Sequence, residues 1–235
     1  MMRTIGLLGG MSWESSAHYY RLINEEARWR LGGTHSAPSV MVSVDFADIE
    51  ALQHAGDWDA LTGRMVDAAR QVEGGGAQLL VICTNTMHRM ADAVQAAITI
   101  PLLHIADPVG RAIADQGLGT VGLLGTAFTM EQPFLRARLH DRFDLEVITP
   151  DADDRLAVHR IIYDELVRGI ITEPAREIYR AVIQRLADRG AQAIILGCTE
   201  IMLLIGQPDS PVPLFDTTTL HALAAVEAAL AEGGA

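Results

Sequence analysis

The chain has 235 residues, of which 49% are hydrophobic and 20% are charged, a composition that fits one large globular domain or two small ones. Its formal net charge of −12 disfavours nucleic acids and anionic membranes as partners, because binding them requires clustered Lys and Arg. No apolar run approaches the ~18 residues of a membrane span, and no secretory signal is recognised, so we expect a cytoplasmic protein with reduced thiols.

Short apolar runs alternate with longer amphipathic stretches, a pattern typical of βαβ units around parallel sheets. In chain order the sequence predicts strand 4–8, helix 15–30, strand 40–44, helix 58–74, strand 79–83, helix 88–97, strand 102–104 and helix 107–116. It then predicts strand 121–124, helix 129–142, strand 145–148, helix 153–168, helix 174–189, strand 193–196, strand 214–215 and helix 217–232.

The two cysteines lie at matching places in an internal repeat. Cys83 ends "GGGAQLLVICTNT" and Cys198 ends "DRGAQAIILGCTE", while "IGLLGG" from Ile5 recurs as "VGLLGT" from Val121. The offset between the two cysteines is 115 residues, close to the 116 residues that separate the two glycine-rich segments. The stretches 99–101 and 207–213 resemble crossings between the halves. We therefore expect a first α/β domain of residues 1–99 plus 213–235, and a second of 100–212.

Cys83 and Cys198 each end a predicted parallel strand, the edge at which open α/β sheets bind ligands. Free backbone N–H groups at such a turn would favour an anion and lower a thiol pKa from about 8.5 toward neutrality. Two facing thiols suit proton exchange at one carbon, since one removes the α-proton and the other protonates the opposite face. The alternative is that both cysteines are buried and structural. Candidate donors for a substrate carboxylate are Ser12, Thr84, Asn85, Thr86, Thr126 and Thr199, each of which could instead cap a helix.

Other motifs carry less weight. The string "GLGTVG" at 117–122 fits a dinucleotide fingerprint but precedes a strand, which is the wrong context. Eight histidines lack metal-ligand spacing, so no metal is expected, and a hydrogen-bonded role is favoured for His88 and His104.

The segments "IGLLGGMSWESSAHYYRLIN", "CTNTMH", "LLGTAFTM" and "LGCTEI" resemble the aspartate/glutamate racemase family, and most closely its broad-specificity amino-acid racemase branch. The resemblance covers nearly the whole chain. It implies two pseudo-symmetric Rossmann-like α/β domains with an active site in the cleft between them, no cofactor such as pyridoxal phosphate, and a homodimer. It also implies that Cys83 and Cys198 are catalytic. The binding residues that it implies are Met11, Ser12, Thr84, Asn85, Thr86, Thr126, Thr129, Thr199 and Glu200.

Two departures from the family bear on the substrate. Glutamate racemases usually have Cys-Thr-His where this chain has Glu200 after Thr199. Aspartate-specific members carry an Arg after the second strand, whereas the stretch 44–53 offers Asp45, Asp48, Glu50 and Gln53. Glu165 and Arg168 stand near the place of a family Lys. We therefore expect Gln53 and Glu165 among the binding residues, and a neutral polar or basic amino acid rather than an acidic one as substrate.

Several alternatives stay open at this stage. The chain could be a strict aspartate racemase, or a relative that acts as a maleate isomerase, a decarboxylase or a hydantoin racemase. Retention of both thiols argues against single-thiol chemistry. An inactive metabolite-binding protein is the rival outside enzymology, because a fold does not fix a function. A thiol redox protein is weaker still, since no Cys-x-x-Cys is present.

Overall fold

A computed structural model describes residues 1–231 of the chain. It divides into two compact units. Unit 1 comprises Met1–His104 together with the segment that begins at His221, and unit 2 comprises Ile105–Leu220. None of the helices described in residues 1–231 is long and apolar enough to cross a membrane.

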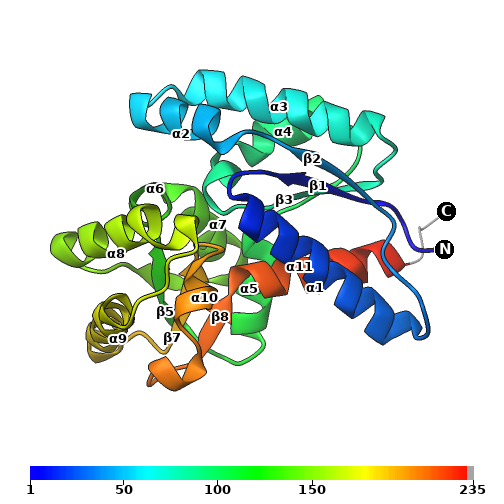
Figure 1. Cartoon of the computed structure of the whole chain (residues 1–235). Helices are drawn as coiled ribbons and strands as arrows, with labels where there is room; N and C mark the ends of the chain where they lie inside the picture. The colour runs from blue at the N-terminus through cyan, green and yellow to red at the C-terminus, as the bar shows by residue number, and fades with distance from the viewer. Residues whose placement is uncertain (232–235) are drawn as a thin grey trace. The chain divides into compact units, whose positions relative to one another are not determined.

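Unit 1 is built around a parallel sheet with the strand order β2-β1-β3-β4. Its elements are β1 (Ile5–Gly9), α1 (Trp13–Leu31), β2 (Ser39–Ser43), α2 (Phe46–Ala55), α3 (Trp58–Gly74), β3 (Leu79–Ile82), the 3₁₀ helix η1 (Thr86–Met90), α4 (Ala91–Ala97), β4 (Leu102–Leu103) and most of α11 (Thr217–Leu230). One apolar layer packs α1 and α11 against one face of this sheet, and another packs α2, α3 and α4 against the opposite face (Figure 1).

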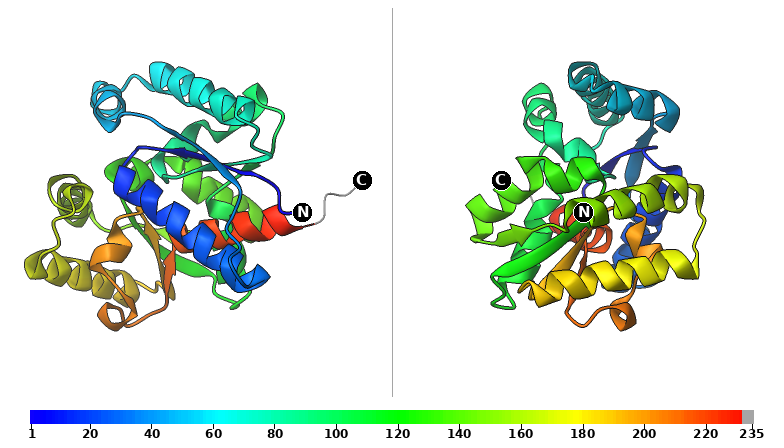
Figure 2. Two further views of the ribbon diagram at one scale, coloured as in Figure 1. Left: turned by 45° about the vertical axis from the view of Figure 1, so that its right-hand side comes forward. Right: turned by 90° about the vertical axis from the view of Figure 1, so that its left-hand side faces the viewer.

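Unit 2 is also built around a four-stranded parallel sheet, in the order β6-β5-β7-β8. Its elements are α5 (Ala106–Ala114), β5 (Thr120–Gly125), α6 (Ala127–Glu131), α7 (Pro133–Phe143), β6 (Glu146–Ile148), α8 (Ala152–Asp164), η2 (Leu166–Arg168), α9 (Glu173–Asp188), β7 (Ala193–Gly197), α10 (Ile201–Leu204), η3 (Gln207–Asp209) and β8 (Leu214–Asp216). Helices α5 and α7 pack on one face of the sheet, and α8 and α9 pack on the other (Figure 2). The α/β fold class with two similar parallel sheets is thus confirmed.

The two sheets have the same strand order, but the pairing of β1 with β3 and the pairing of β5 with β7 differ by one residue relative to the sequence repeat. Leu8 of β1 pairs with Ile82 of β3. Leu124 of β5, which corresponds to Leu8 in the sequence repeat, pairs with Leu196 of β7. The structural equivalent of Cys83 is therefore Gly197, and Cys198 lies one position farther along. Because successive strand residues face opposite ways, Cys83 packs in the layer with α1 and α11, while Cys198 packs in the layer with α8 and α9.

All eight expected strands are present, but some helices and boundaries differ from those expected. Helix α2 was not predicted, although Asp45 caps it and Gly56 ends it with a left-handed φ of 69°. Pro133 starts α7 and splits the helix predicted over 129–142. The units divide after His104 and Leu220, because β4 pairs with β3 and β8 pairs with β7. The predicted end of the last helix, Glu232, lies outside the described residues.

Candidate functional site

Cys83 lies at the carboxyl end of β3, where its N–H donates to the carbonyl of Leu8 at 2.9 Å. Its side chain is buried in an apolar layer that includes Tyr19 and Ile23. The acceptor nearest to its thiol is the carbonyl of Val81, at 3.9 Å. Burial raises the pKa of this thiol far above its ordinary value.

The turn after Cys83 carries three of the predicted binding residues. Asn85 and Thr86 are buried and Thr84 is half-buried, and the turn leads directly into η1. His88 closes it, because its Nδ1 donates to the carbonyl of Thr84 at 2.8 Å. The hydrogen-bonded role expected for His88 is therefore correct, and it acts on the peptide next to the thiol.

His88 also belongs to a buried cluster of three histidines. Its ring centroid lies 4.6 Å from that of His104 and 5.6 Å from that of His221. His221 Nε2 donates to the carbonyl of Leu103 at 2.8 Å, so its Nδ1 accepts the hydroxyl of Tyr19 at 3.0 Å. Nothing in the sequence indicates that the three histidines, of which His88 and His221 lie 133 positions apart, would meet.

The turn after β1 carries Met11 and Ser12, both buried. Ser12 caps α1, since its hydroxyl accepts the N–H of Ser15 at 3.3 Å. Gly10 has a left-handed φ of 93°, and its N–H donates to Ser16 Oγ at 2.8 Å. This N–H therefore has an acceptor within the turn.

In unit 2 the turn after β7 brings a thiol and a carboxylate together. Cys198 Sγ donates to Glu200 Oε2 at 3.0 Å, and Thr199 Oγ1 donates to the same oxygen at 2.8 Å. All three side chains are buried. Burial raises the pKa of Cys198 well above its ordinary value, and the adjacent Glu200 carboxylate raises it further. The expectation of thiol pKa values near neutrality is therefore wrong for both cysteines in this structure.

Thr126 directly follows β5, the strand next to β7, and Thr129 lies in α6. Thr126 caps α6 by accepting the N–H of Thr129 at 3.3 Å, and the two hydroxyls are 3.3 Å apart. The close approach depends on glycines, because a Cβ at Gly125 would stand 2.8 Å from the carbonyl of Gly197. The carboxyl edge of unit 2 therefore places Thr126 and Thr129, which follow β5, near the turn after β7 that carries Cys198.

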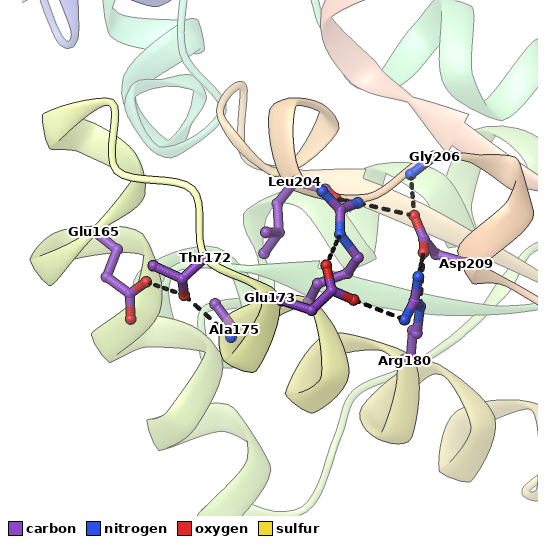
Figure 3. Close-up of polar contacts among 9 residues, drawn as sticks. Glu165, Thr172, Glu173, Ala175, Arg180, Leu204, Gly206 and Asp209 are labelled. Atoms are coloured by element: carbon purple, nitrogen blue, oxygen red, sulfur yellow. Dashed lines mark hydrogen bonds and ion pairs between the residues drawn. The ribbon is translucent and has the colours of Figure 1, made fainter.

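Glu165 lies between α8 and η2, and it accepts the hydroxyl of Thr172 at 2.8 Å (Figure 3). Thr172 in turn caps α9 by accepting the N–H of Ala175. Arg168 is exposed at the end of η2. The structure thus gives Glu165 a role in holding the start of α9.

The same view shows how the segment after α10 is held. The buried carboxylate of Asp209 accepts Arg180 Nε at 2.7 Å, Arg176 at 3.2 Å and the N–H of Gly206 at 2.9 Å (Figure 3). These contacts lower the pKa of Asp209, chiefly through the Gly206 N–H. They join α9 to the chain that follows the thiol turn.

The predicted specificity stretch 44–53 forms only part of a pocket. A pocket of about 260 Å³ lies between β2, α2 and α3 and contains Asp45, Asp48, Asp67 and Arg64. Arg64 Nη2 lies 4.0 Å from Asp48, so a guanidinium of α3 reaches a stretch that has no Arg of its own. Gln53 is buried on α2 and does not line this pocket, and neither does Glu50. Among the residues that the structure describes, no cluster suited to hold a metal is found.

The sequence and the fold resemble those of known racemases. Residues 8–225 match the sequence profile of the family described as Asp/Glu/Hydantoin racemase. A crystal structure of a candidate Asp/Glu racemase from Yersinia pestis is 52% identical over 97% of this chain and 100% of its own, with a TM-score of 0.91. An aspartate racemase homologue from Pyrococcus horikoshii is 32% identical over 97% of this chain and 99% of its own, with a TM-score of 0.83.

Curated relatives give a similar result at lower identity. The broad specificity amino-acid racemase of Bacillus subtilis is 22% identical over 97% of this chain and 98% of its own length. The glutamate racemase of Pseudomonas putida is 30% identical over 62% of this chain, and the chain spans about half of that enzyme's length, 54%.

Proposed function

The chain belongs to the Asp/Glu/hydantoin racemase family, and we propose that it is an amino-acid racemase in which Cys83 and Cys198 exchange protons with the substrate Cα. The observation that carries this proposal is that the two thiols directly follow corresponding strands, with Cys198 one position beyond the residue equivalent to Cys83. Each follows the third strand of a parallel sheet, and the two sheets have the same strand order. Thiols at the carboxyl edges of two such sheets suit a two-base reaction, in which the substrate Cα would be approached from both sides.

In this proposal one thiolate takes the α-proton and the other thiol donates a proton to the opposite face of the carbanion. The turns after β1, β3, β5 and β7 would hold the substrate carboxylate, since N–H and hydroxyl donors stabilise the negative charge that develops. Several of these hydroxyls cap helices in the structure, so their orientation is already restrained.

The proposal requires no pyridoxal phosphate. That cofactor is bound through a Schiff base with a lysine, and all 18 Lys and Arg residues of this chain are arginines. The cytoplasmic location and the homodimer stay predictions.

We further propose that neutral polar and basic side chains are preferred over acidic ones. The stretch 44–53 contributes Asp45 and Asp48 to the pocket between β2, α2 and α3, and Asp67 adds a third carboxylate. A substrate carboxylate beside them would meet like charge. A strict aspartate or glutamate racemase is the second candidate, because Arg64 supplies the guanidinium that such a substrate needs.

One experiment tests both parts of the proposal. The parent protein and two variants, Cys83→Ser and Cys198→Ser, are incubated in heavy water with single enantiomers of aspartate, glutamate, homoserine and lysine. Racemisation by each variant should fall by roughly 10²–10⁴-fold, because a serine hydroxyl is a poor acid and base here. Each variant should still exchange deuterium into one enantiomer only, so each is the control for the other.

Near-normal racemisation by either variant, or dependence on added pyridoxal phosphate, would refute the two-thiol mechanism. In the same panel kcat/KM should be greater for homoserine and lysine than for aspartate and glutamate. A clear preference for an acidic substrate would instead select the second candidate and give Arg64 a direct role.

A further inference from the structure

The two thiols differ in the groups that surround them. Cys198 Sγ donates to a buried carboxylate oxygen of Glu200 at 3.0 Å. Within residues 1–231, the acceptor found for Cys83 Sγ is the carbonyl of Val81 at 3.9 Å, and burial alone, without a neighbouring charge, raises the pKa of this thiol. The repeat that relates the two turns therefore does not extend to their electrostatics.

Glu200 is placed to accept hydrogen bonds from the turn that carries Cys198. Its Oε2 takes two hydrogen bonds, one from Cys198 and one from Thr199, and the side chain is 3% exposed. An ionised carboxylate has acceptor sites only, so this arrangement requires hydrogen on the sulfur. If Cys198 lost its proton, two negative charges would stand about 3 Å apart in a poorly solvated site, which is strongly unfavourable.

We infer that Glu200 holds Cys198 in its thiol form, so that Cys198 is the resting proton donor of the pair and Cys83 is the cysteine that ionises first. This inference rests on the proposed racemase function. It assigns Glu200 as a positioning residue, because it acts through the sulfur and not on the substrate.

The proton transfers balance in this assignment. The Cys83 thiolate forms an S–H bond with the α-proton, and the Cα–H electron pair stays on the substrate as a carbanion. The Cys198 S–H bond then breaks, its proton goes to the opposite face of Cα, and its electron pair stays on sulfur. Turnover leaves Cys83 protonated and Cys198 as a thiolate beside Glu200. The resting form returns when Cys198 takes up a proton from solvent and Cys83 releases one to solvent.

Other ionisable groups of unit 2 act on the same pair. Tyr179 of α9 is buried, and it interacts electrostatically with Cys198, with Glu200 and with Glu165 at the end of α8. The hydroxyl of Thr199 is neutral and donates to the same oxygen of Glu200. In the part of the chain that the structure describes, the ionisable side chains that interact with Cys198 are therefore Glu200 and Tyr179, and each is negative when it ionises.

The decisive test measures the thiol and not the reaction. Cys83→Ser leaves Cys198 as the chain's sole cysteine, and Cys83→Ser/Cys198→Ser provides a blank without thiols. The ultraviolet absorbance of the thiolate is followed against pH in Cys83→Ser with and without Glu200→Gln. Removing the charge should move the midpoint to lower pH by about one unit or more. Glu177→Gln, which removes an exposed carboxylate from α9, should leave the midpoint in place.

An unchanged midpoint in Glu200→Gln would overturn the inference even if the protein is a racemase. Should that variant not fold, Glu200→Asp retracts the carboxylate by one methylene, and a smaller shift in the same direction is expected. An unchanged midpoint in Glu200→Asp would then count against the inference. Because this titration needs no activity, failure of the racemase proposal would not be mistaken for failure of the thiol assignment.

With active protein, the pH profile of kcat/KM provides a second readout. The alkaline limb reports loss of the donor proton, so Glu200→Gln should move that limb to lower pH. A merely structural role would reduce the amplitude and leave the limb in place, and this result, or movement of the acidic limb alone, would contradict the assignment of Cys198 as donor.

Discussion

His88 connects the thiol turn of unit 1 to a buried cluster of histidines, and this makes the unit sensitive to acid. Burial lowers the pKa of His88 well below its ordinary value, and His104 and His221 lower it further. The unfolded chain binds a proton near pH 6.5 while the folded chain does not. Protonation of His88 in the unfolded chain therefore leaves the free energy of unfolding unaffected above about pH 6.5 and lowers it progressively as the pH falls below that value.

We predict that His88→Asn flattens this dependence. Asn cannot titrate, and its amide can donate to the carbonyl of Thr84 in place of Nδ1. The free energy of unfolding, measured in urea between pH 7 and pH 5, should fall less steeply in the variant, by up to about 1.4 kcal/mol per pH unit. His35→Asn, in an exposed loop, is the control and should keep the parental slope. A parental slope in His88→Asn would show that His88 is not the titrating group.

The turns that carry Cys83 and Cys198 were predictable from residue types, because apolar runs that end in Cys-Thr mark the carboxyl ends of buried strands. The contact between Cys198 and Glu200 was not predictable. It depends on how the turn after β7 folds back, and the sequence indicated only that Glu200 departs from the usual histidine. Arg64 escaped prediction for a similar reason, since α3 carries it to a stretch about 16 residues earlier in the chain.

At the scale of elements, strong apolar periodicity was a reliable guide and short helices were not. The range predicted for α3 agrees with the observed Trp58–Gly74. Helix α2 begins at Phe46, only three residues after β2 ends at Ser43. Because no long connection separates the two elements, the sequence pattern did not indicate where the strand stopped and a helix began. Its capping residue Asp45 and its terminal Gly56 were the available signals, but Asp45 was interpreted as part of the specificity stretch 44–53.

Two glycines, Gly6 in β1 and Gly63 in α3, differ in how closely they are packed, and they allow the contact between β1 and α3 to be tested. Gly6 lies in the central strand β1, where an added Cβ would meet the side chain of Val72 on α3 and stand 2.8 Å from Ala77 Cβ and 2.9 Å from the carbonyl of Leu79. Gly63 lies within α3 itself, is exposed, and has open space around its Cα. The two positions therefore form a matched pair.

Gly6→Ala should lower the free energy of unfolding by about 1–3 kcal/mol, because it overpacks the contact between strand and helix. Gly63→Ala should raise it by about 0.5–1 kcal/mol, since alanine favours a helix interior over glycine. Chemical denaturation of both variants beside the parent checks the pair. Equal effects of the two substitutions would contradict the close packing at Gly6.

At the scale of the whole molecule, the chain connectivity makes the two units unequal. Unit 2 is one continuous segment whose sheet is covered on both faces by its own helices. Unit 1 needs two segments, because α11 supplies Ala222, Ala225, Val226 and Ala229 to the layer that also buries Cys83. Without them, one face of the sheet of unit 1 would be exposed to water.

We therefore predict that a chain ending at Leu220 loses the folded form of unit 1 and keeps that of unit 2. All three tryptophans, Trp13, Trp29 and Trp58, lie in unit 1, so their fluorescence reports that unit alone. In the shortened chain the fluorescence transition in urea should move to much lower urea or disappear, because burial of four apolar side chains is lost. Circular dichroism should still show a cooperative transition, which coincides with that of a separate 105–220 fragment as the control. An unchanged fluorescence midpoint would mean that unit 1 is stable without α11, and non-cooperative unfolding of the 105–220 fragment would mean that unit 2 does not fold independently.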